Sequence, residues 1–292
     1  MEQCRQVTAH GPGSVEFLPQ SMVVDLAVQD GRVQGAWGLG RHDDEPFAVA
    51  APAVVLATGG AGELFAINVF PEGQTGDGYA MALRAGLPLT NFEFIQIGPS
   101  IVHPIKFALS GVFWRLDPKI TNILYEEFLP RYLPEGVDLN KAIYIKGVSY
   151  PFTVRNESKW VDVGVFTEIS EGRGTEHRGV YMSLAHQPAE VIETEARVPF
   201  EHLMKYGLDL RTDPVEFAPA VQHFNGGVRM DEEARTAIAG LCVCGENAGG
   251  QHGADRPGGN ALADAQVFGR RAGASAARAG GRADVALVRA RA

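Results

Sequence analysis

Residues 240–273 read GLCVCGENAGGQHGADRPGGNALADAQVFGRRAG, and this stretch decides the fold more than any other. Its apolar start predicts a short strand over 241–244, and its alanine-rich end predicts a long helix over about 261–279. The connection between them, 245–259, is rich in glycine and carries little side-chain bulk. A strand that leads through a glycine-rich loop into a helix is typical of an α/β fold.

A second strand and glycine-rich loop stand near the N-terminus, in APAVVLATGGAG at 51–62. An all-apolar strand of this kind is expected to be buried on both faces. Asp30-Gly31 separates two strand-like runs and predicts a tight hairpin turn. We therefore expect a β-meander followed by a helix over 76–85 with Gly86 as its C-cap. The predicted strands of the meander cover 14–18, 22–29, 32–39 and 47–57.

The middle of the chain has a different composition, with mixed, aromatic and proline-containing segments from 97 to 219. We interpret it as an inserted α+β subdomain, which includes a helix over 161–171. The glycine-rich composition returns after Phe217 with a Gly-Gly turn at 226–227, which is followed by a short hairpin and the strand at 241–244. The chain is thus predicted as one α/β domain built from residues 1–96 and 220–292, interrupted by the subdomain at 97–219. The tail after Arg278 is expected to be frayed.

Composition excludes several classes of function. The chain has 292 residues, 45% of them hydrophobic, and a formal net charge of -9, which argues against binding to nucleic acid. No apolar run reaches the roughly 18 residues of a membrane span, so we expect no membrane span and a cytoplasmic location. Cys242 and Cys244 alternate along one predicted strand and are expected to be buried structural thiols rather than metal ligands. No metal site is predicted.

Two long segments resemble the flavoproteins of the fumarate reductase, succinate dehydrogenase and L-aspartate oxidase family. One is APAVVLATGGAG followed by TGDGYAMALRAGLPLTNFEFIQ at 75–96, and the other is the block at 240–273. The resemblance implies part of a Rossmann-like FAD-binding domain, interrupted by a capping subdomain. It also implies FAD as the cofactor, and a dicarboxylate-like small-molecule substrate held between the two parts at the flavin face.

The same resemblance assigns residues to the flavin. Thr58, Gly59 and Gly60 would form a loop near the adenosine side, and Asp77 and Glu246 would hydrogen-bond FAD. In the second block, glycines would let the backbone approach the flavin ring, and free N–H groups at the helix start would stabilise negative charge on the reduced flavin. The residues of this block are Gly258, Gly259, Asn260, Ala261 and Leu262.

Three residues are expected at the substrate. Arg256 matches the family's substrate-clamping arginine, whose guanidinium binds a carboxylate through two hydrogen bonds. His223 matches a family histidine only if one residue is deleted, and Gln222 is the equivalent without that gap. His252 matches the histidine of the family's His-Gly-Ala-Asn-Arg, where a structural role is as plausible as polarisation or proton transfer.

The sequence also departs from the family. Gly98 stands where the family has a substrate-binding histidine, and His103 is either a substitute from five residues further on or a surface residue. Ser158 occupies the position of the proton-donor arginine, for which Arg155 and Lys159 are nearby substitutes or solvated charges. Neither fumarate reduction nor succinate oxidation is therefore expected without change.

No Gly-x-Gly-x-x-Gly motif follows a predicted strand in these 292 residues, although the family uses that motif to hold the FAD pyrophosphate. We expect this chain alone to bind FAD weakly or not at all. Either a second chain supplies the missing segment, or the chain is a truncated gene product. The sequence thus predicts an FAD-dependent oxidoreductase subunit that transfers hydride between flavin N5 and a carboxylate- or carbonyl-bearing molecule. The alternative is a non-catalytic paralogue that serves as a scaffold or regulatory subunit.

Overall fold

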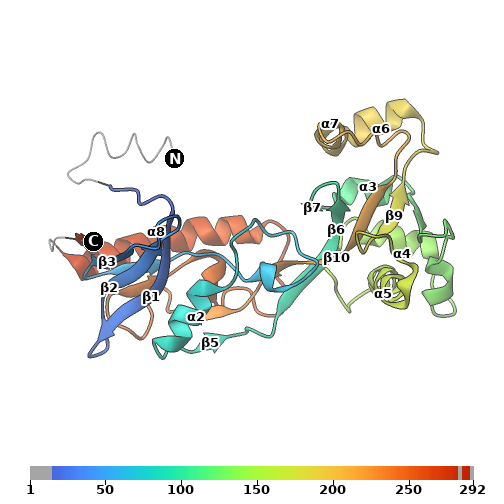
Figure 1. The fold of residues 1–292 in the computed structure, drawn as a ribbon. Helices are drawn as coiled ribbons and strands as arrows, with labels where there is room; N and C mark the ends of the chain where they lie inside the picture. The colour runs from blue at the N-terminus through green and yellow to red at the C-terminus, as the bar shows by residue number, and fades with distance from the viewer. Residues whose placement is uncertain (1–14, 282–284, 290–292) are drawn as a thin grey trace.

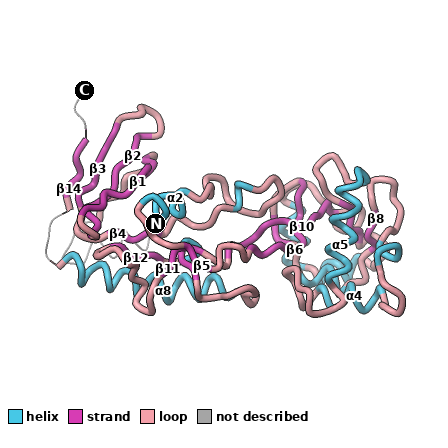
Figure 2. Tube along the Cα trace, turned by 90° about the horizontal axis from the view of Figure 1, so that it is seen from below, coloured by secondary structure: helices cyan, strands magenta, loops and turns pink. Residues whose placement is uncertain are grey.

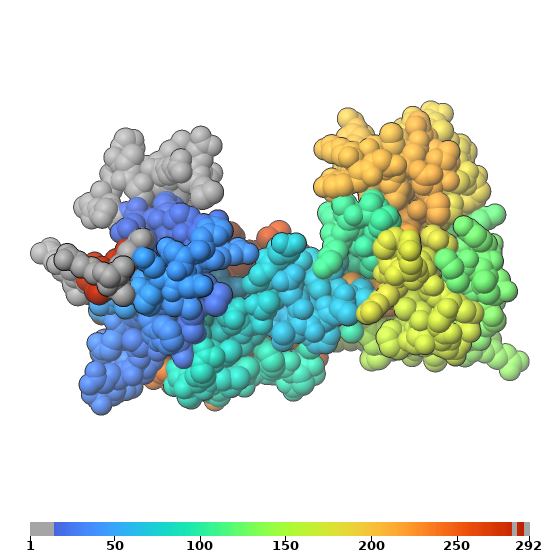
Figure 3. Space-filling model, in the orientation of Figure 1, coloured from blue at the N-terminus to red at the C-terminus, as the bar shows by residue number. Residues whose placement is uncertain are grey.

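The protein has the mixed α/β structure that was predicted, and its chain is arranged in two lobes. A computed structural model describes residues 15–281 and 285–289. One lobe contains the glycine-rich segments and is called here the glycine-rich lobe; the other, the capping lobe, contains the middle of the chain (Figure 1). In the space-filling view the surface is hollowed between the two lobes (Figure 3).

An antiparallel sheet forms one end of the glycine-rich lobe, with strand order β1-β2-β3-β14. The predicted hairpin is confirmed, since Asp30 and Gly31 both have positive φ, 50° and 71°, and Gly31 tolerates this without a Cβ. The tail is not frayed throughout, because β14 extends the sheet beside β3. The strands are β1 (Ser21–Gln29), β2 (Arg32–Gly40), β3 (Pro46–Ala50) and β14 (Ala286–Arg289).

Two of the predicted strands differ from the structure. The run 47–57 is not one strand but β3 and β4 (Val54–Leu56), with Pro52 in the break, where its missing N–H cannot take part in a ladder. Residues 15–18 form no strand, and residue 14 lies outside the described residues.

Short parallel and antiparallel pairs build the glycine-rich region. β12 (Leu241–Val243) pairs with β4 in parallel, so the two predicted glycine-rich loops leave neighbouring strands in the same direction. The short hairpin expected between the Gly-Gly turn and 241 has no strand pair among the described residues. β11 (Gly227–Arg229) pairs with β5 (Leu89–Thr90) and β13 (Ala248–Gly249), and a single bridge joins Arg235 to Cys242. A short 3-10 turn ends the first loop, η1 at Gly62–Leu64, and another begins the second loop, η4 at Gly245–Asn247.

The two predicted helices of this lobe are present as α2 (Asp77–Arg84) and α8 (Asn260–Gly280). α8 lies against β4 and β12 (Figure 2). Cys242 and Cys244 are buried beneath it in a small cluster with Ala234 and Ala272, which confirms their expected burial. Burial raises the pKa of both thiols, as expected of structural cysteines. Within the described residues no helix is long and apolar enough to span a membrane.

The capping lobe is a five-stranded antiparallel sheet covered by short helices, with strand order β7-β6-β10-β9-β8. The helix expected over 161–171 is present as α5 (Lys159–Glu168), which continues as a π-helical turn, η3 (Ile169–Arg173). The strands are β6 (Ile95–His103), β7 (Phe107–Ala108), β8 (Lys119–Thr121), β9 (Val180–Ser183) and β10 (Val215–Phe224). The other helices are α3 (Gly111–Arg115), η2 (Leu129–Tyr132), α4 (Leu139–Lys146), α6 (Ala189–Glu195) and α7 (Arg197–Met204).

One antiparallel pair, β6 with β10, runs from one lobe to the other (Figure 1). Its capping end contributes Ile101 and Phe217 to one hydrophobic core, and its other end contributes Val221 and Phe224 to a second core. The two cores therefore meet along a single ribbon. This ribbon carries side chains from both strands into the region between the lobes.

Candidate functional site

Glu246 lies in η4, directly after β12. Its Oε1 accepts a hydrogen bond of 2.8 Å from the amide of Phe224, and its backbone carbonyl accepts one from the hydroxyl of Tyr79. Burial raises the pKa of Glu246 to about 7, while the Phe224 amide and the charge of Arg256 oppose the rise. A carboxyl group with this pKa can hold or release a proton near neutral pH.

The loop 58–60 packs against the same turn. Asn247 is fully buried, and its Oδ1 accepts a hydrogen bond of 3.2 Å from Thr58 Oγ1. The amide of Gly60 donates to Gln74 Oε1 over 3.2 Å. A Cβ at Gly60 would lie 2.4 Å from Glu246 Oε1, so only glycine fits this close approach. The two glycine-rich loops thus form one unit.

Arg256 is buried, with 7% of its surface exposed, in the loop before α8. Its Nη1 donates to the carbonyl of Pro257 at 3.2 Å, and its own carbonyl accepts from Gln96 Nε2 of β6 at 2.8 Å. Burial lowers the pKa of the guanidinium, and Glu246 acts against that decrease. Its Nε has no hydrogen-bond partner among the described residues. A buried donor without a partner is rare in proteins and indicates a place for a ligand.

Two histidines lie beside Arg256. The rings of His223 and His252 meet edge to face with centroids 5.6 Å apart. Burial and the charge of Arg256 lower the pKa of His223 to about 3, and the same two causes lower the pKa of His252. Both imidazoles are therefore neutral at pH 7. His223 Nδ1 lies 3.2 Å from Asn225 Oδ1, and with that oxygen as acceptor Nδ1 carries the proton and Nε2 keeps the lone pair.

A β-bulge explains the one-residue ambiguity at this position. Val221 pairs with Ile97 and His223 with Gln96, so two residues of β10 oppose one step of β6, and Gln222 is the extra residue. A bulge is the structural form of a one-residue insertion. It directs His223 into the site and leaves Gln222 beside Gly98, where a Cβ would lie 2.9 Å from Gln222 Oε1.

Buried polar atoms without partners gather in this region. Seven such side-chain atoms occur among the described residues. Four of them lie in the segments that carry His223, His252 and Arg256, and a fifth, on Gln96, lies opposite His223 in the β6–β10 ladder. Each lacks a protein partner although burial without one costs about 1–3 kcal/mol. The concentration of unpaired groups points to a bound molecule that supplies the partners. We call these five the unpaired polar group: Gln96, Gln222, Asn225, Gln251 and Arg256.

The start of α8 is open to solvent. Gly258, Gly259 and Asn260 are exposed, and a Cβ at either glycine would meet no described atom within 4 Å. The expectation of a free N–H at Leu262 is wrong, because this amide donates to the carbonyl of Gly259 over 3.2 Å. Ala261 lies next to it and is partly exposed. The glycines therefore leave room at the helix start, as the binding of a flat ring requires.

The other predicted residues are less closely joined to the site. Asp77 is exposed in the first turn of α2 and accepts a hydrogen bond from Thr75 Oγ1. His103 is exposed at the far end of β6 and stacks on His177. Lys159 bonds the carbonyl of Val154 in its own loop.

The position of the family's proton donor is filled by a structural serine. Ser158 is buried with its hydroxyl on Asn156 Oδ1 at 2.6 Å, before the first turn of α5. Arg155 reaches out of the capping lobe to Asp255, next to Arg256, with Nη1 and Oδ2 3.2 Å apart. Of the two suggested substitutes, Arg155 is thus the one that contacts the Arg256 loop.

Sequence reasoning missed several residues of the site. No role follows from the sequence for Asn247, Asn225 or Asp264, and only the fold brings them together with the predicted residues. Burial raises the pKa of Asp264 to about 6, and its Oδ2 lies 3.9 Å from His252 Nε2. Gln96 lies inside a segment that resembles the family, and that was the one available signal for it.

Comparisons with known proteins give a family match and several relatives. A family model described as FAD binding domain matches residues 3–262. The chain is 39% identical over 272 residues to a subunit of the fumarate reductase (CoM/CoB) of Methanothermobacter marburgensis, covering 90% of this chain and 46% of that protein. L-aspartate oxidase of Pseudomonas aeruginosa is 31% identical, with 89% of this chain and 47% of that protein covered.

A solved structure also resembles this chain in its fold. The structure of Mycobacterium smegmatis Sdh1 in complex with UQ1 superposes with a TM-score of 0.74 at 33% identity, covering 90% of this chain and 42% of that one. The chain spans slightly less than half the length of these three proteins.

Proposed function

The chain belongs to the FAD binding domain family, and from this premise we propose that it is part of an FAD-dependent oxidoreductase that acts on a small anionic molecule bearing a carboxylate or carbonyl group. The observation that carries the proposal is the unpaired polar group around Arg256. FAD, when bound, would exchange hydride with that molecule.

The residues present fit such a cofactor. The open backbone at Gly258 and Gly259 leaves space for a ring, and the buried carboxyl of Glu246 offers a hydrogen-bonding group near it. We propose that Thr58, Gly59, Gly60, Asp77, Glu246 and the residues 258–262 hold FAD. A scaffold protein would have no need to keep five buried polar atoms unpaired.

Arg256 would bind the anionic group of the substrate. Its Nε has no partner in the part of the chain that the structure describes, and a guanidinium in a site of low polarity attracts a carboxylate more strongly than one in water. Neutral His223 and His252 would accept or share a hydrogen bond at the reacting end of the molecule. Because both imidazoles are neutral at pH 7, they suit polarisation and proton acceptance better than proton donation.

We further propose that a second chain holds the FAD pyrophosphate through a Gly-x-Gly-x-x-Gly segment. Support comes from the relatives, one of which is a subunit of a fumarate reductase (CoM/CoB). We also propose a functional division into 1–96 and 220–292 for the cofactor and 97–219 for capping and substrate selection. The two hydrophobic cores that meet along β6 and β10 support that division.

The test is a visible absorption spectrum of the purified chain, alone and after co-expression with the products of neighbouring genes. Flavin bands that appear only in a complex support both the cofactor and the second chain. Protein that stays colourless in every combination overturns the oxidoreductase proposal.

A matched pair of variants then tests the substrate site in the yellow complex. Arg256→Gln should abolish reduction or oxidation of carboxylate-bearing probes while keeping the flavin spectrum. Arg270→Gln, an exposed arginine on α8, should leave turnover unchanged. Equal turnover in Arg256→Gln and Arg270→Gln would remove Arg256 from the site.

A further inference from the structure

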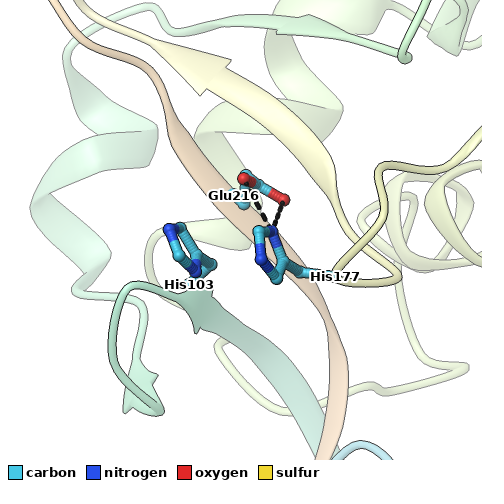
Figure 4. A group of neighbouring side chains, drawn as sticks. All are labelled: His103, His177 and Glu216. Atoms are coloured by element: carbon cyan, nitrogen blue, oxygen red, sulfur yellow. Dashed lines mark hydrogen bonds and ion pairs between the residues drawn. The ribbon is translucent and has the colours of Figure 1, made fainter.

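Three potential metal ligands meet on the capping lobe, away from the site described above. His103, His177 and Glu216 each offer one ligand atom, and these atoms all lie within 4.8 Å of one another (Figure 4). His177 Nδ1 lies 3.1 Å from Glu216 Oε1 and 3.0 Å from Oε2. The rings of His103 and His177 are stacked, with centroids 3.8 Å apart and planes inclined by 12°.

The fold fixes the positions of all three side chains. His103 and Glu216 are directly opposite each other in the β6–β10 ladder, at the end of one strand and the start of the other. His177 belongs to the tight turn 175–179 before β9, which is closed by hydrogen bonds between Thr175 and Gly179 in both directions. β9 pairs with β10 at Glu216. Two adjacent strands and the turn before a third thus hold the three side chains on hydrogen-bonded backbone, as a metal site requires.

The spacing suits a borderline divalent metal. Zinc bonds to nitrogen and oxygen of about 2.0–2.2 Å place two ligands of a tetrahedron roughly 3.3 Å apart, close to the observed separation of His177 and Glu216. Two imidazoles with one carboxylate form a ligand set typical of zinc sites with an open position, whereas magnesium and calcium prefer oxygen ligands. Because the two imidazole planes are nearly parallel, one ring has to turn about its side-chain bonds for both rings to direct a nitrogen lone pair at the same ion.

The cluster is accessible to an ion from solution. His103 is exposed, and the side chains of His177 and Glu216 are 34% and 14% exposed. His177 also lines a cavity of about 300 Å³ together with Lys106, Glu176 and Arg178. Glu176 lies 3.9 Å from His177 Nε2 and supplies a further carboxylate near the two basic residues of the cavity.

We propose that His103, His177 and Glu216 bind a divalent transition metal ion of borderline softness, with Zn²⁺ as the representative. This site differs from the cofactor and substrate site in its residues and its lobe, and it was not predicted from the sequence, where the three residues lie 39 to 113 positions apart. The ion would join β6, β10 and the turn before β9. The proposal is independent of the oxidoreductase activity.

The test is titration of the full, chelator-treated chain with Zn²⁺ by isothermal calorimetry, followed by Co²⁺, whose visible absorption reports four-coordinate geometry. We expect one ion per chain. His177→Ala and Glu216→Gln should weaken binding by more than the roughly 10- to 100-fold that is typical when an outer-shell partner is lost. His103→Ala should weaken it and change the Co²⁺ spectrum.

His186→Ala is the matched control, since His186 is an exposed histidine of the same lobe outside the cluster. It should bind Zn²⁺ as the unaltered chain does. Circular dichroism and an unfolding curve for each variant separate loss of the site from loss of the fold. The proposal is overturned if the unaltered chain does not bind Zn²⁺, or if the three cluster variants bind Zn²⁺ as tightly as the unaltered chain does.

Discussion

Two buried polar regions of this molecule differ in how completely their groups are paired. In the capping lobe the Glu168 carboxylate is fully buried and accepts hydrogen bonds from Tyr132 at 2.6 Å, Arg173 at 2.7 and 3.0 Å, and Asn122 at 3.0 Å. Between the lobes, Arg256 is almost as deeply buried, yet its Nε has no partner among the described residues. Burial of a charged group alone therefore does not identify a ligand-binding site. Most buried polar groups of the capping lobe are paired and stabilise the fold, with Trp114 Nε1 and Asp162 Oδ1 as its unpaired atoms among the described residues, whereas the five unpaired atoms around Arg256 indicate a ligand.

The largest expected effect is on the pair Lys146–Asp162 of the capping lobe, whose atoms Nζ and Oδ2 are 2.5 Å apart with both side chains buried. Lys146→Met should destabilise the protein by about 3–5 kcal/mol, because it leaves a buried carboxylate without its cation. The double variant Lys146→Met with Asp162→Leu should recover most of that loss. Urea unfolding measures both.

Lys141→Met provides the control for this pair. Lys141 forms an exposed ion pair with Glu157, and its removal should cost at most about 1 kcal/mol. Equal losses in the free energy of unfolding for Lys146→Met and Lys141→Met would mean that the capping lobe does not depend on its buried pairs. That result would contradict the role given to paired buried groups.

Glu168→Gln should have the next largest effect. Burial acts to raise the pKa of Glu168, but the hydrogen bonds from Arg173, Tyr132 and Asn122 prevail and lower it to about 2. The group therefore stabilises the fold above its ordinary pKa, and this contribution is lost as the pH falls toward 2. Glu168→Gln should cost about 2–3 kcal/mol at pH 7 and flatten the acid limb of the stability curve.

Glu171→Gln is the matched change, since Glu171 contacts the same Arg173 but is half exposed. It should leave the free energy of unfolding within about 1 kcal/mol of the unaltered protein. An acid limb of stability that persists in Glu168→Gln would contradict the role given to this carboxylate.

Local sequence signals predicted the paired and periodic parts of the fold. The hairpin at Asp30-Gly31, the helices α2, α5 and α8, and the buried Cys242 and Cys244 follow from turn chemistry and periodicity, which act over a few residues. The break at Pro52 separated one predicted strand into two, although proline within a run is itself a local signal. β14 was missed because its partner β3 lies more than 200 positions away.

In the candidate site, too, some residues were predicted from local sequence and others depend on contacts between distant segments. Arg256, His223, His252 and Glu246 were found through resemblance in contiguous segments, and their roles stay predictions. The structure adds two features that the spacing of residues in the sequence does not indicate. The bulge at Gln222 arises from strand register, and the gathering of unpaired groups arises from the meeting of β6, β10 and the loop before α8.

Arg256→Gln tests whether the loss of a partly paired buried group costs little stability. Because the guanidinium is only partly paired, its loss should change the free energy of unfolding by less than about 1 kcal/mol, far below the effect at Lys146. The charge of Arg256 lowers the pKa of Glu246, so the variant should raise that pKa above about 7. Carbon-13 NMR of the Glu246 carboxyl measures the shift. A large loss of stability would show that Arg256 is a structural residue.

The smallest effect is expected where the two regions touch, at Arg155 and Asp255. The side chains are 76% and 38% exposed, so Arg155→Ala should change stability by less than about 1 kcal/mol, and added salt should remove even that difference. Arg197→Ala breaks an equally exposed pair within α7 and serves as the control. If Arg155→Ala lowers turnover in the flavin-containing complex while Arg197→Ala does not, the ion pair positions the Arg256 loop against the capping lobe. Equal turnover in both variants would leave it a solvated surface contact.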